Sequence, residues 1–320
     1  MKVLALLALA LAVLAPAAAQ DGVRLFGRLD ASIDRVNGRA AVLDNNSHLG
    51  LAVSEALAPG LTALAGLDAG VALDSGAAST PLLRNSYLGL AAAWGTLVLG
   101  HLDFDQPTGA PVYTAMLHEV DLVAHDGGAS AIGAFLNGRN RVNGALGYLS
   151  PPLGAWSVRA RANRTAGGAQ SQGDLGLFYD GAPLSASLAL ARDTRQGGLQ
   201  AGEFAYKWQA GAALRTALGK FHALAGVDHY RPAPGARGAV RYWLAGWTVQ
   251  LGERDRITSN TVQRTLAEGP RGRMLAVQSG LVHTMTARSR CFLLLDRRNA
   301  DDRLARAVTR SVSAGLQLRF

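Results

Sequence analysis

The sequence lacks the cysteine pairs of disulfide-rich proteins and the long apolar runs of helical membrane proteins. Its single cysteine, Cys291, cannot form an internal disulfide. Hydrophobic residues make up 49% of the chain, yet beyond residue 19 no apolar run approaches the roughly 20 residues that a transmembrane helix needs. Aromatic residues make up only 6%. The composition therefore excludes an internal disulfide scaffold and membrane spans built from helices.

Residues 1–19 have the three parts of a secretory signal peptide. Met1-Lys2 precedes an Ala/Leu/Val run from Val3 to Ala15, and Ala17-Ala18-Ala19 supplies a small-x-small cleavage site. The run is too short to cross a bilayer as a helix. We expect cleavage after Ala19, export, and a single mature domain of residues 20–320. Its formal net charge would be +8, because the chain carries +9 and Lys2 is removed.

Apolar residues beyond residue 19 are dispersed at every second position. In residues 311–320 the apolar members are Val312, Ala314, Leu316, Leu318 and Phe320. Residues 22–36, 155–164 and 202–209 show the same alternation. Because successive strand side chains point to opposite faces, the pattern predicts strands with one apolar and one polar face. Segments bounded by Gly, Pro, Asn or Asp suggest about sixteen strands of roughly ten residues each.

The polar faces decide between a soluble β-sandwich and a membrane barrel. They carry closely spaced arginines such as Arg159 and Arg161, whereas small residues such as Ala160 and Ala162 occupy the apolar face. Small residues make a poor sandwich core, and a water-filled lumen accommodates facing charges. The chain also stops inside a half-apolar strand, at Phe320, which suits pairing of the last strand with the first. We therefore predict an all-β, transmembrane antiparallel barrel.

The connections between the predicted strands are unequal in length. Short turns such as Ala58-Pro59-Gly60 alternate with longer segments, and the longest runs from about Asp103 to Gly138. It contains the acidic residues Glu119, Asp121 and Asp126. A connection of this length usually has a function or is disordered. In a barrel we expect it to fold back into the lumen.

Several short motifs follow the order and spacing of one known family. They are Leu25-Phe26-Gly27-Arg28, Ser47-His48-Leu49-Gly50-Leu51, Arg84-Asn85-Ser86-Tyr87-Leu88-Gly89-Leu90, Arg141-Val142-Asn143-Gly144 and the terminal Phe320. With these motifs the mature chain resembles the trimeric general porins of the Gram-negative outer membrane, of the kind common in β-proteobacteria. The resemblance implies sixteen strands, a homotrimer within outer-membrane lipid and lipopolysaccharide, and a third loop that narrows the channel.

The resemblance also implies a constriction with a basic wall opposite loop carboxylates. Arg28, Arg84 and Arg141 match the basic wall positions of the family, and His48 stands where the family has an arginine. Glu119 resembles the loop carboxylate, and Asp121 lies beside it in the acidic loop. The loop lacks the usual Pro-Glu-Phe-Gly core of the family, and the low aromatic content predicts thin interfacial girdles. No cofactor and no metal ion is expected.

The function predicted on this basis is passive diffusion of small hydrophilic solutes and ions, with a weak preference for anions. The alternative is a substrate-selective porin for sugars, phosphate or nucleosides. Such channels typically need an aromatic track along the lumen, and Phe26 and Tyr242 are the aromatic residues identified at lumen parity. This scarcity favours general diffusion.

Two other classes fit less well. An outer-membrane barrel enzyme would need a nucleophile or carboxylate beside a histidine at one rim. His125-Asp126 and Asp228-His229 are adjacent in sequence, which places their side chains on opposite faces of a strand. A nucleic-acid partner would explain a pI near 10.3. The arginines, however, are scattered through strands of an exported chain, so no nucleic-acid partner is expected.

Overall fold

The computed structural model describes residues 22–102, 142–164, 171–193, 206–218, 221–232, 240–266, 273–302 and 305–320. These residues form one antiparallel sheet of 17 strands, which confirms the all-β prediction. Within this part of the chain no helix is both long and apolar enough to cross a bilayer. The predicted signal peptide and the predicted loop of residues 103–138 lie outside the described residues.

The strands have the following bounds: β1 Val23–Val36, β2 Arg39–Asp44, β3 His48–Ala58, β4 Leu61–Val71, β5 Ala78–Ala92, β6 Gly95–Leu102, β7 Val142–Leu149, β8 Trp156–Arg164, β9 Ser171–Gly181, β10 Leu184–Asp193, β11 Tyr206–Leu218, β12 Phe221–Pro232, β13 Val240–Gln250, β14 Asp255–Leu266, β15 Arg273–Thr284, β16 Ser289–Asp302 and β17 Ala305–Arg319.

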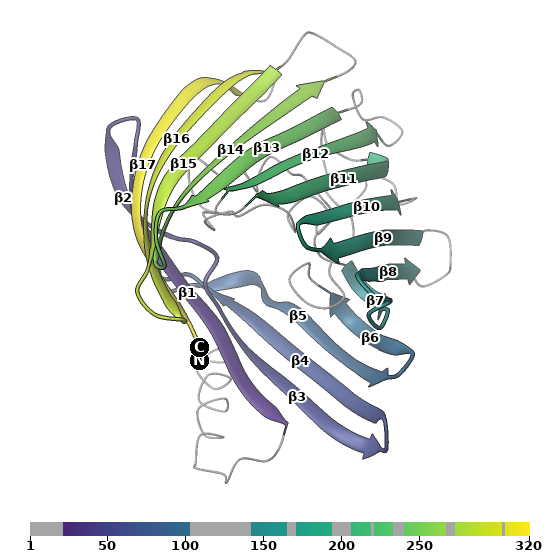
Figure 1. The fold of residues 1–320 in the computed structure, drawn as a ribbon. Helices are drawn as coiled ribbons and strands as arrows, with labels where there is room; N and C mark the ends of the chain where they lie inside the picture. The colour runs from purple at the N-terminus through teal and green to yellow at the C-terminus, as the bar shows by residue number, and fades with distance from the viewer. Residues whose placement is uncertain are drawn as a thin grey trace.

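Strand pairing closes the sheet into a ring. From β3 to β17 each strand pairs with the next along the chain, and β1 pairs with β3 on one side and β17 on the other. Of the 17 described strands only β2 stands outside the ring, where it pairs with the Ala31–Val36 half of β1. Figure 1 shows β9 and β10 across the ring from β1 and β17.

The two faces of the sheet differ in the way that the alternation predicts. In β1 the polar side chains of Asp30, Ser32 and Asp34 are buried, whereas Ile33 is 63% exposed. In β17 Ser313 is fully buried and Leu316 is 53% exposed. A soluble protein would show the reverse arrangement. We call the face with the buried polar residues inward and the apolar, exposed face outward, which is the pattern of a membrane barrel.

The two rims of the ring differ in their connections. One rim carries both ends of the described chain and short turns, such as 59–60, 93–94, 251–254 and 285–288. The other carries most of the longer connections, including 72–77, 103–141 and 194–205. Outer-membrane barrels have short periplasmic turns and longer extracellular loops. In a barrel of that class the rim with the chain ends is the periplasmic one, and we call the other rim the outer rim.

Glycines paired directly with aromatic residues fix the register of several strands. The pairs are Phe26 with Gly50, Tyr87 with Gly66, Phe292 with Gly315, and Phe320 with Gly27. At Gly315 a Cβ would lie 2.2 Å from Cζ of Phe292, so the ring occupies the space above the glycine. Phe320 exchanges two backbone hydrogen bonds with Gly27, of 3.1 and 3.2 Å. The terminal aromatic residue thus joins the first strand to the last.

Gly315→Val tests this packing. Its Cβ would meet the Phe292 ring and come within 2.9 Å of the Ala31 carbonyl oxygen, which belongs to the backbone. We expect a loss of roughly 1–3 kcal/mol in the free energy of unfolding, measured by urea titration of the refolded chain. Gly252→Val is the matched control, because a Cβ at Gly252 meets no atom within 4 Å. Equal stability of the two variants would contradict the proposed packing.

Candidate functional site

Three of the predicted basic residues meet at one backbone oxygen on the inward face. Arg28 of β1 donates from Nη2 to the carbonyl oxygen of Asn46 at 3.1 Å, and Arg84 of β5 donates from Nη1 to the same oxygen at 3.3 Å. Nδ1 of His48, the first residue of β3, lies 3.1 Å from it. Arg28 also pairs directly with His48 across the strands. The structure thus brings together Arg28, His48 and Arg84.

The Asn45–Ser47 segment between β2 and β3 presents this oxygen. Asn46 adopts a left-handed conformation with φ of 67°, which asparagine tolerates better than most residues. Asn45, fully buried, donates from Nδ2 to Oδ1 of Asp30 and to Oγ of Ser32, each at 3.1 Å. Ser47 Oγ accepts from the Asp30 backbone N–H at 2.9 Å. These bonds hold the segment against the inward face of β1.

A β-bulge turns Arg84 towards the site. The register with β4 passes from Asp68–Asn85 to Ala69–Leu83, so Arg84 is the extra residue in β5. Both Arg84 and Asn85 are consequently buried, at 1% and 2% exposure, although they are neighbours in a strand. Bulges often re-aim a side chain at a functional site. Simple alternation would have sent one of these two side chains outward.

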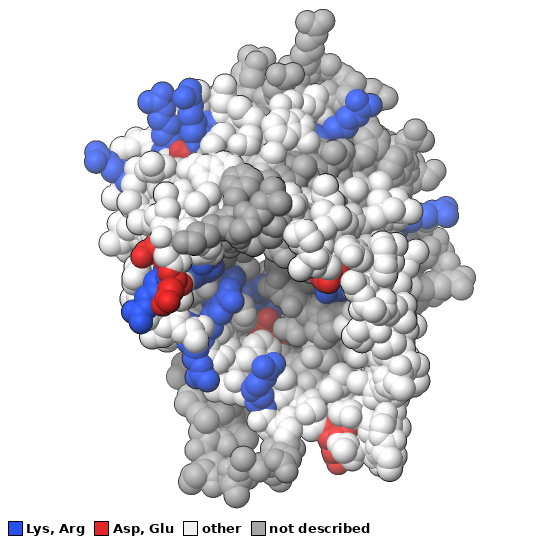
Figure 2. All heavy atoms as spheres, viewed as in Figure 1, with Lys and Arg blue, Asp and Glu red and all other residues white. Residues whose placement is uncertain are grey.

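Further arginines extend the basic wall beyond the residues that the sequence analysis singled out. Arg319 of β17 pairs directly with Arg28. Arg290 of β16 and Arg256 of β14 lie on the inward face of strands further around the ring. The alternation of the sequence could have identified these arginines, because each alternates with the apolar residues of its strand. In Figure 2 basic side chains gather on the left of the central hollow. We call these residues, with Arg28, His48 and Arg84, the basic wall.

Asp30, two residues after Arg28 in β1, is held by hydrogen bonds at the seam, that is, at the junction where β1 pairs with β17. Asp30 is fully buried and accepts from Asn45 and from Nε2 of Gln317 in β17, and the charges of Arg28 and Arg290 act on it. Gln317 in turn accepts from Nε of Arg319 at 3.1 Å. Hydrogen bonds therefore run from β1 to β17 beneath the basic wall and fix the position of Arg319.

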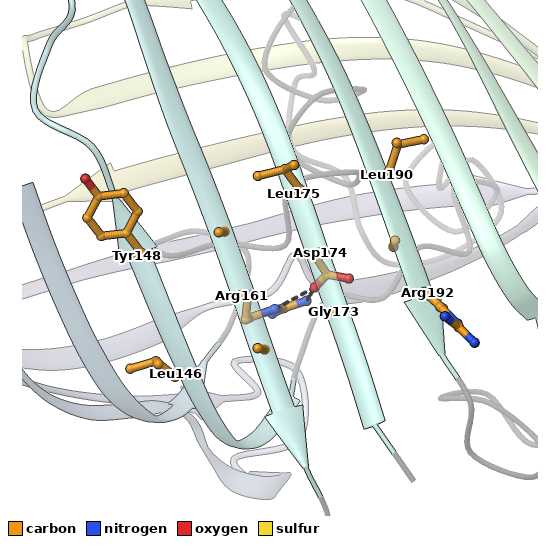
Figure 3. A pocket seen from close by; sticks show the side chains of 11 residues that line it. Leu146, Tyr148, Arg161, Gly173, Asp174, Leu175, Leu190 and Arg192 are labelled. Atoms are coloured by element: carbon orange, nitrogen blue, oxygen red, sulfur yellow. Dashed lines mark hydrogen bonds and ion pairs between the residues drawn. The ribbon is translucent and has the colours of Figure 1, made fainter.

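The opposite side of the ring carries a neutralised arginine. Arg161 of β8 donates from Nε and Nη2 to Oδ2 of Asp174 in β9, at 2.8 and 2.7 Å, and from Nη1 to the Leu102 carbonyl oxygen at 3.2 Å. Figure 3 shows this pair between β8 and β9. The guanidinium of Arg159 lies over the Phe178 ring, 4.7 Å from its centroid. Phe178 is an inward aromatic residue that the sequence analysis missed.

The remaining predicted site residues are outside the part of the chain that the structure describes. They are Arg141, predicted for the basic side of the constriction, and Glu119 and Asp121, predicted for the acidic loop. Their roles, like the assignment of Arg28, His48 and Arg84 to a constriction, stay predictions.

Comparison with known proteins assigns the family. Residues 5–299 match the family model described as Gram-negative porin. No curated protein sequence matches significantly. The chain belongs to the Gram-negative porin family, and it is an outer-membrane barrel that forms a channel.

Solved structures share the fold at low sequence identity. The anion-selective porin from Comamonas acidovorans has 17% identity and a TM-score of 0.70, over 93% of this chain and 99% of that one. The trimer form of OmpT from Vibrio cholerae has 11% identity and a TM-score of 0.71, over 93% and 99%. OmpF from Salmonella typhi has 12% identity and a TM-score of 0.65, over 93% and 97%.

The buried ion pair offers a direct test of the wall opposite the site. Its side chains are 1% and 2% exposed, so Arg161→Met leaves the Asp174 charge buried without its main partner. We expect a loss of roughly 3–5 kcal/mol in the free energy of unfolding. Arg161→Met/Asp174→Leu should recover most of this loss, because neither charge remains. Urea titration measures both, and a double variant no more stable than the single one would argue against the pair.

Proposed function

We propose that this channel admits small hydrophilic solutes by passive diffusion and favours anions over cations. The observation that carries the preference is the convergence of Arg28, Arg84 and His48 on one neutral carbonyl oxygen, with Arg290 and Arg319 beside them. Arginines outnumber the buried carboxylates on this side of the ring, so the wall keeps a positive potential that attracts anions into the lumen.

Unequal charge on the two sides of the ring makes this potential directional. On the β8–β9 side Arg161 is neutralised by Asp174 at hydrogen-bonding distance. On the β1 side Arg28, Arg84, Arg256, Arg290, Arg298 and Arg319 outnumber the buried carboxylates of Asp30, Asp34, Asp68 and Asp296. The field therefore points across the channel and extends over about 8–10 Å at ordinary ionic strength. An anion is stabilised near the basic wall, where a cation is repelled.

A constriction inside the channel is the second part of the proposed function. We infer that the connection of residues 103–138 folds into the lumen and places Glu119 and Asp121 opposite the basic wall, with Arg141 adding to that wall. Carboxylates there would strengthen the transverse field and moderate the anion preference. The name of the Comamonas porin, which is anion-selective, supports the sign of this preference.

Assembly and surroundings follow the same reasoning. We propose a homotrimer in the outer membrane, in contact with its lipid and lipopolysaccharide; the trimer form of Vibrio OmpT, a protein of the same fold, supports this assembly. The outward face supplies a surface suited to apolar contacts, with exposed leucines such as Leu88, Leu99 and Leu295. Such a face is buried either by acyl chains or by a neighbouring protomer.

A substrate-selective channel is the alternative, and inward aromatic residues bear on it. Phe178 and Phe292 both point inward, but they are only 1% and 5% exposed. A solute cannot stack on rings that are covered. Phe178 and Phe292 therefore contribute nothing to an aromatic track. The inward rings of Phe26 and Tyr87 pack over Gly50 and Gly66, so general diffusion is favoured.

An enzymatic role is also less favoured. Among the described residues, Nδ1 of His283 lies 2.8 Å from Oδ1 of Asp255, and Cys291 pairs with His283 on the next strand. These three positions lie on the outward face, near the periplasmic rim. A Cys–His–Asp arrangement would need a hydrogen bond between thiol and imidazole, and the described contacts of His283 include none with Cys291.

The mature protein should begin at Gln20. We propose that residues 1–19 are a signal peptide and that residues 20–320 form the barrel domain, because a charged start, an apolar core and Ala17-Ala18-Ala19 precede that position. Intact-mass measurement of the protein purified from outer membranes checks this. A purified chain that retains Met1 would contradict the proposal.

The charge of the basic wall should set selectivity. We expect Arg28→Gln/Arg84→Gln to lower the anion-to-cation permeability ratio by about twofold or more, because two positive charges leave the lumen while glutamine can still donate to Asn46. Reversal potentials in a salt gradient across planar bilayers give the ratio. Arg192→Gln/Arg241→Gln is the matched control, because both residues are exposed on the outward face.

The same recordings decide between the alternatives. Cation selectivity of the unmodified channel would refute the proposed preference. Block of single-channel conductance by a saturating sugar, phosphate or nucleoside would instead indicate a substrate-selective porin.

A further inference from the structure

His48 is the member of the basic wall whose charge can change near neutral pH. The other members are arginines, which stay protonated throughout this range. An ordinary histidine gains or loses its proton between about pH 5 and pH 8. His48 is the first residue of β3, and its ring shares the Asn46 oxygen with Arg28 and Arg84. The wall therefore combines fixed positive charges with one variable charge.

A single contact decides which nitrogen of the His48 ring takes up the proton. Nδ1 lies 3.1 Å from the carbonyl oxygen of Asn46. A carbonyl oxygen only accepts hydrogen bonds, so Nδ1 carries its hydrogen in the neutral ring as well as in the protonated one. Nε2 is consequently the nitrogen that binds the additional proton. Protonation thus changes the charge of the wall without breaking the contact that holds the ring.

The surroundings of the His48 ring leave it accessible to water in the channel. The residue is only half-buried, on the inward face of β3. Across the pair with β4 it faces Gly70, which has no side chain to place over the ring. On its other side it pairs with Arg28, whose guanidinium group is directed to the Asn46 oxygen. Water in the lumen can therefore exchange protons with the imidazole.

Charged groups on three neighbouring strands act on His48. Among the described residues they are Arg28 of β1, Arg84 of β5 and Asp68 of β4, whose carboxylate is buried at 4% exposure. The two guanidinium groups repel a third cation, whereas the carboxylate of Asp68 attracts it. When the ring is protonated, three cations face one neutral oxygen and one carboxylate. Protonation therefore adds a positive charge to a wall that is already basic.

Two further carboxylates belong to the elements around His48, and other donors occupy them. Asp44, at the end of β2, accepts from the backbone N–H groups of Ser47 and Leu73 at 3.1 and 3.3 Å. Asp30 of β1 accepts from the side chains of Asn45 and Gln317. The described hydrogen bonds of both carboxylates go to groups other than the imidazole. A variant at His48 alone can therefore separate its titration from theirs.

We propose that His48 makes the anion preference of this channel depend on pH, so that a proton on its ring strengthens the preference and loss of the proton weakens it. Charges that face the lumen bias which ions enter, and their field extends over about 8–10 Å at ordinary ionic strength. The geometry of the wall is the same in both states, so the response needs no movement of a strand or loop. This inference rests on the proposed function, because it concerns the same basic wall.

Reversal potentials across planar bilayers, recorded in one salt gradient at about pH 8 and about pH 5.5, test the dependence. We expect the anion-to-cation permeability ratio of the unmodified channel to rise by roughly 1.5-fold or more on acidification, because one positive charge is added to the lumen wall. An unchanged ratio, or a ratio that falls, would overturn the proposal.

Variants assign the response to one residue. His48→Gln should lose the rise, because glutamine takes up no proton but can still donate to Asn46. His48→Arg should keep the higher ratio at both pH values, because arginine stays protonated, and it keeps the test decisive if the glutamine variant forms no channels. The matched control is His283→Gln, on the outward face beside Asp255, which should keep the full rise. A rise that persists in His48→Gln or His48→Arg would overturn the proposal.

The sign of the selectivity separates this inference from the proposed function. A channel that prefers cations at both pH values, but shifts towards anions on acidification only when His48 is present, would contradict the proposed anion preference and support the inference. An anion-selective channel whose ratio does not change with pH would support the proposed function and overturn the inference.

Discussion

Closure between β1 and β17 is the constraint on which the rest of the structure depends. Within hydrocarbon, an open sheet edge would leave a row of N–H and C=O groups without partners, at several kcal/mol each. The pairing runs from Arg28–Arg319 to Val36–Ser311 and continues to Phe320, which exchanges two hydrogen bonds with Gly27. The last residue of the chain therefore completes the seam, and an alternating pattern that ends on an aromatic residue has a structural reason.

The seam also builds the candidate site. Asp30 and Gln317 join β1 to β17 on the inward face, and Asp30 in turn holds the Asn45–Ser47 segment that offers its carbonyl oxygen to Arg28 and Arg84. Arginines from both ends of the chain consequently share one wall. Electrostatic preference in the lumen is thus tied to correct closure, because a chain that failed to pair β1 with β17 would disperse these charges.

Alternation made most of the fold predictable from the sequence, and it also put Arg28 and His48 on the inward face. Two features of the site could not be predicted in this way. The bulge that re-aims Arg84 depends on its register with β4, which no local pattern encodes. The inward segment at Asn46 depends on side-chain hydrogen bonds that Asn45 and Ser47 make to β1 residues 13–17 positions earlier, which alternation does not encode. Phe178 was missed for a related reason, because an aromatic residue on a polar face contradicts the simple two-face pattern.

Register decides what each arginine does, as the neighbours Arg297 and Arg298 show. Arg297 projects outward, whereas Arg298 points inward and donates from Nη2 to Oγ1 of Thr309 at 3.3 Å. A slip of one residue between β16 and β17 would exchange these roles and move a charge between the channel and the lipid. The Phe292–Gly315 pair joins the same two strands, and its ring fits only over a residue without a side chain. This packing therefore protects selectivity as well as stability, although it lies outside the basic wall.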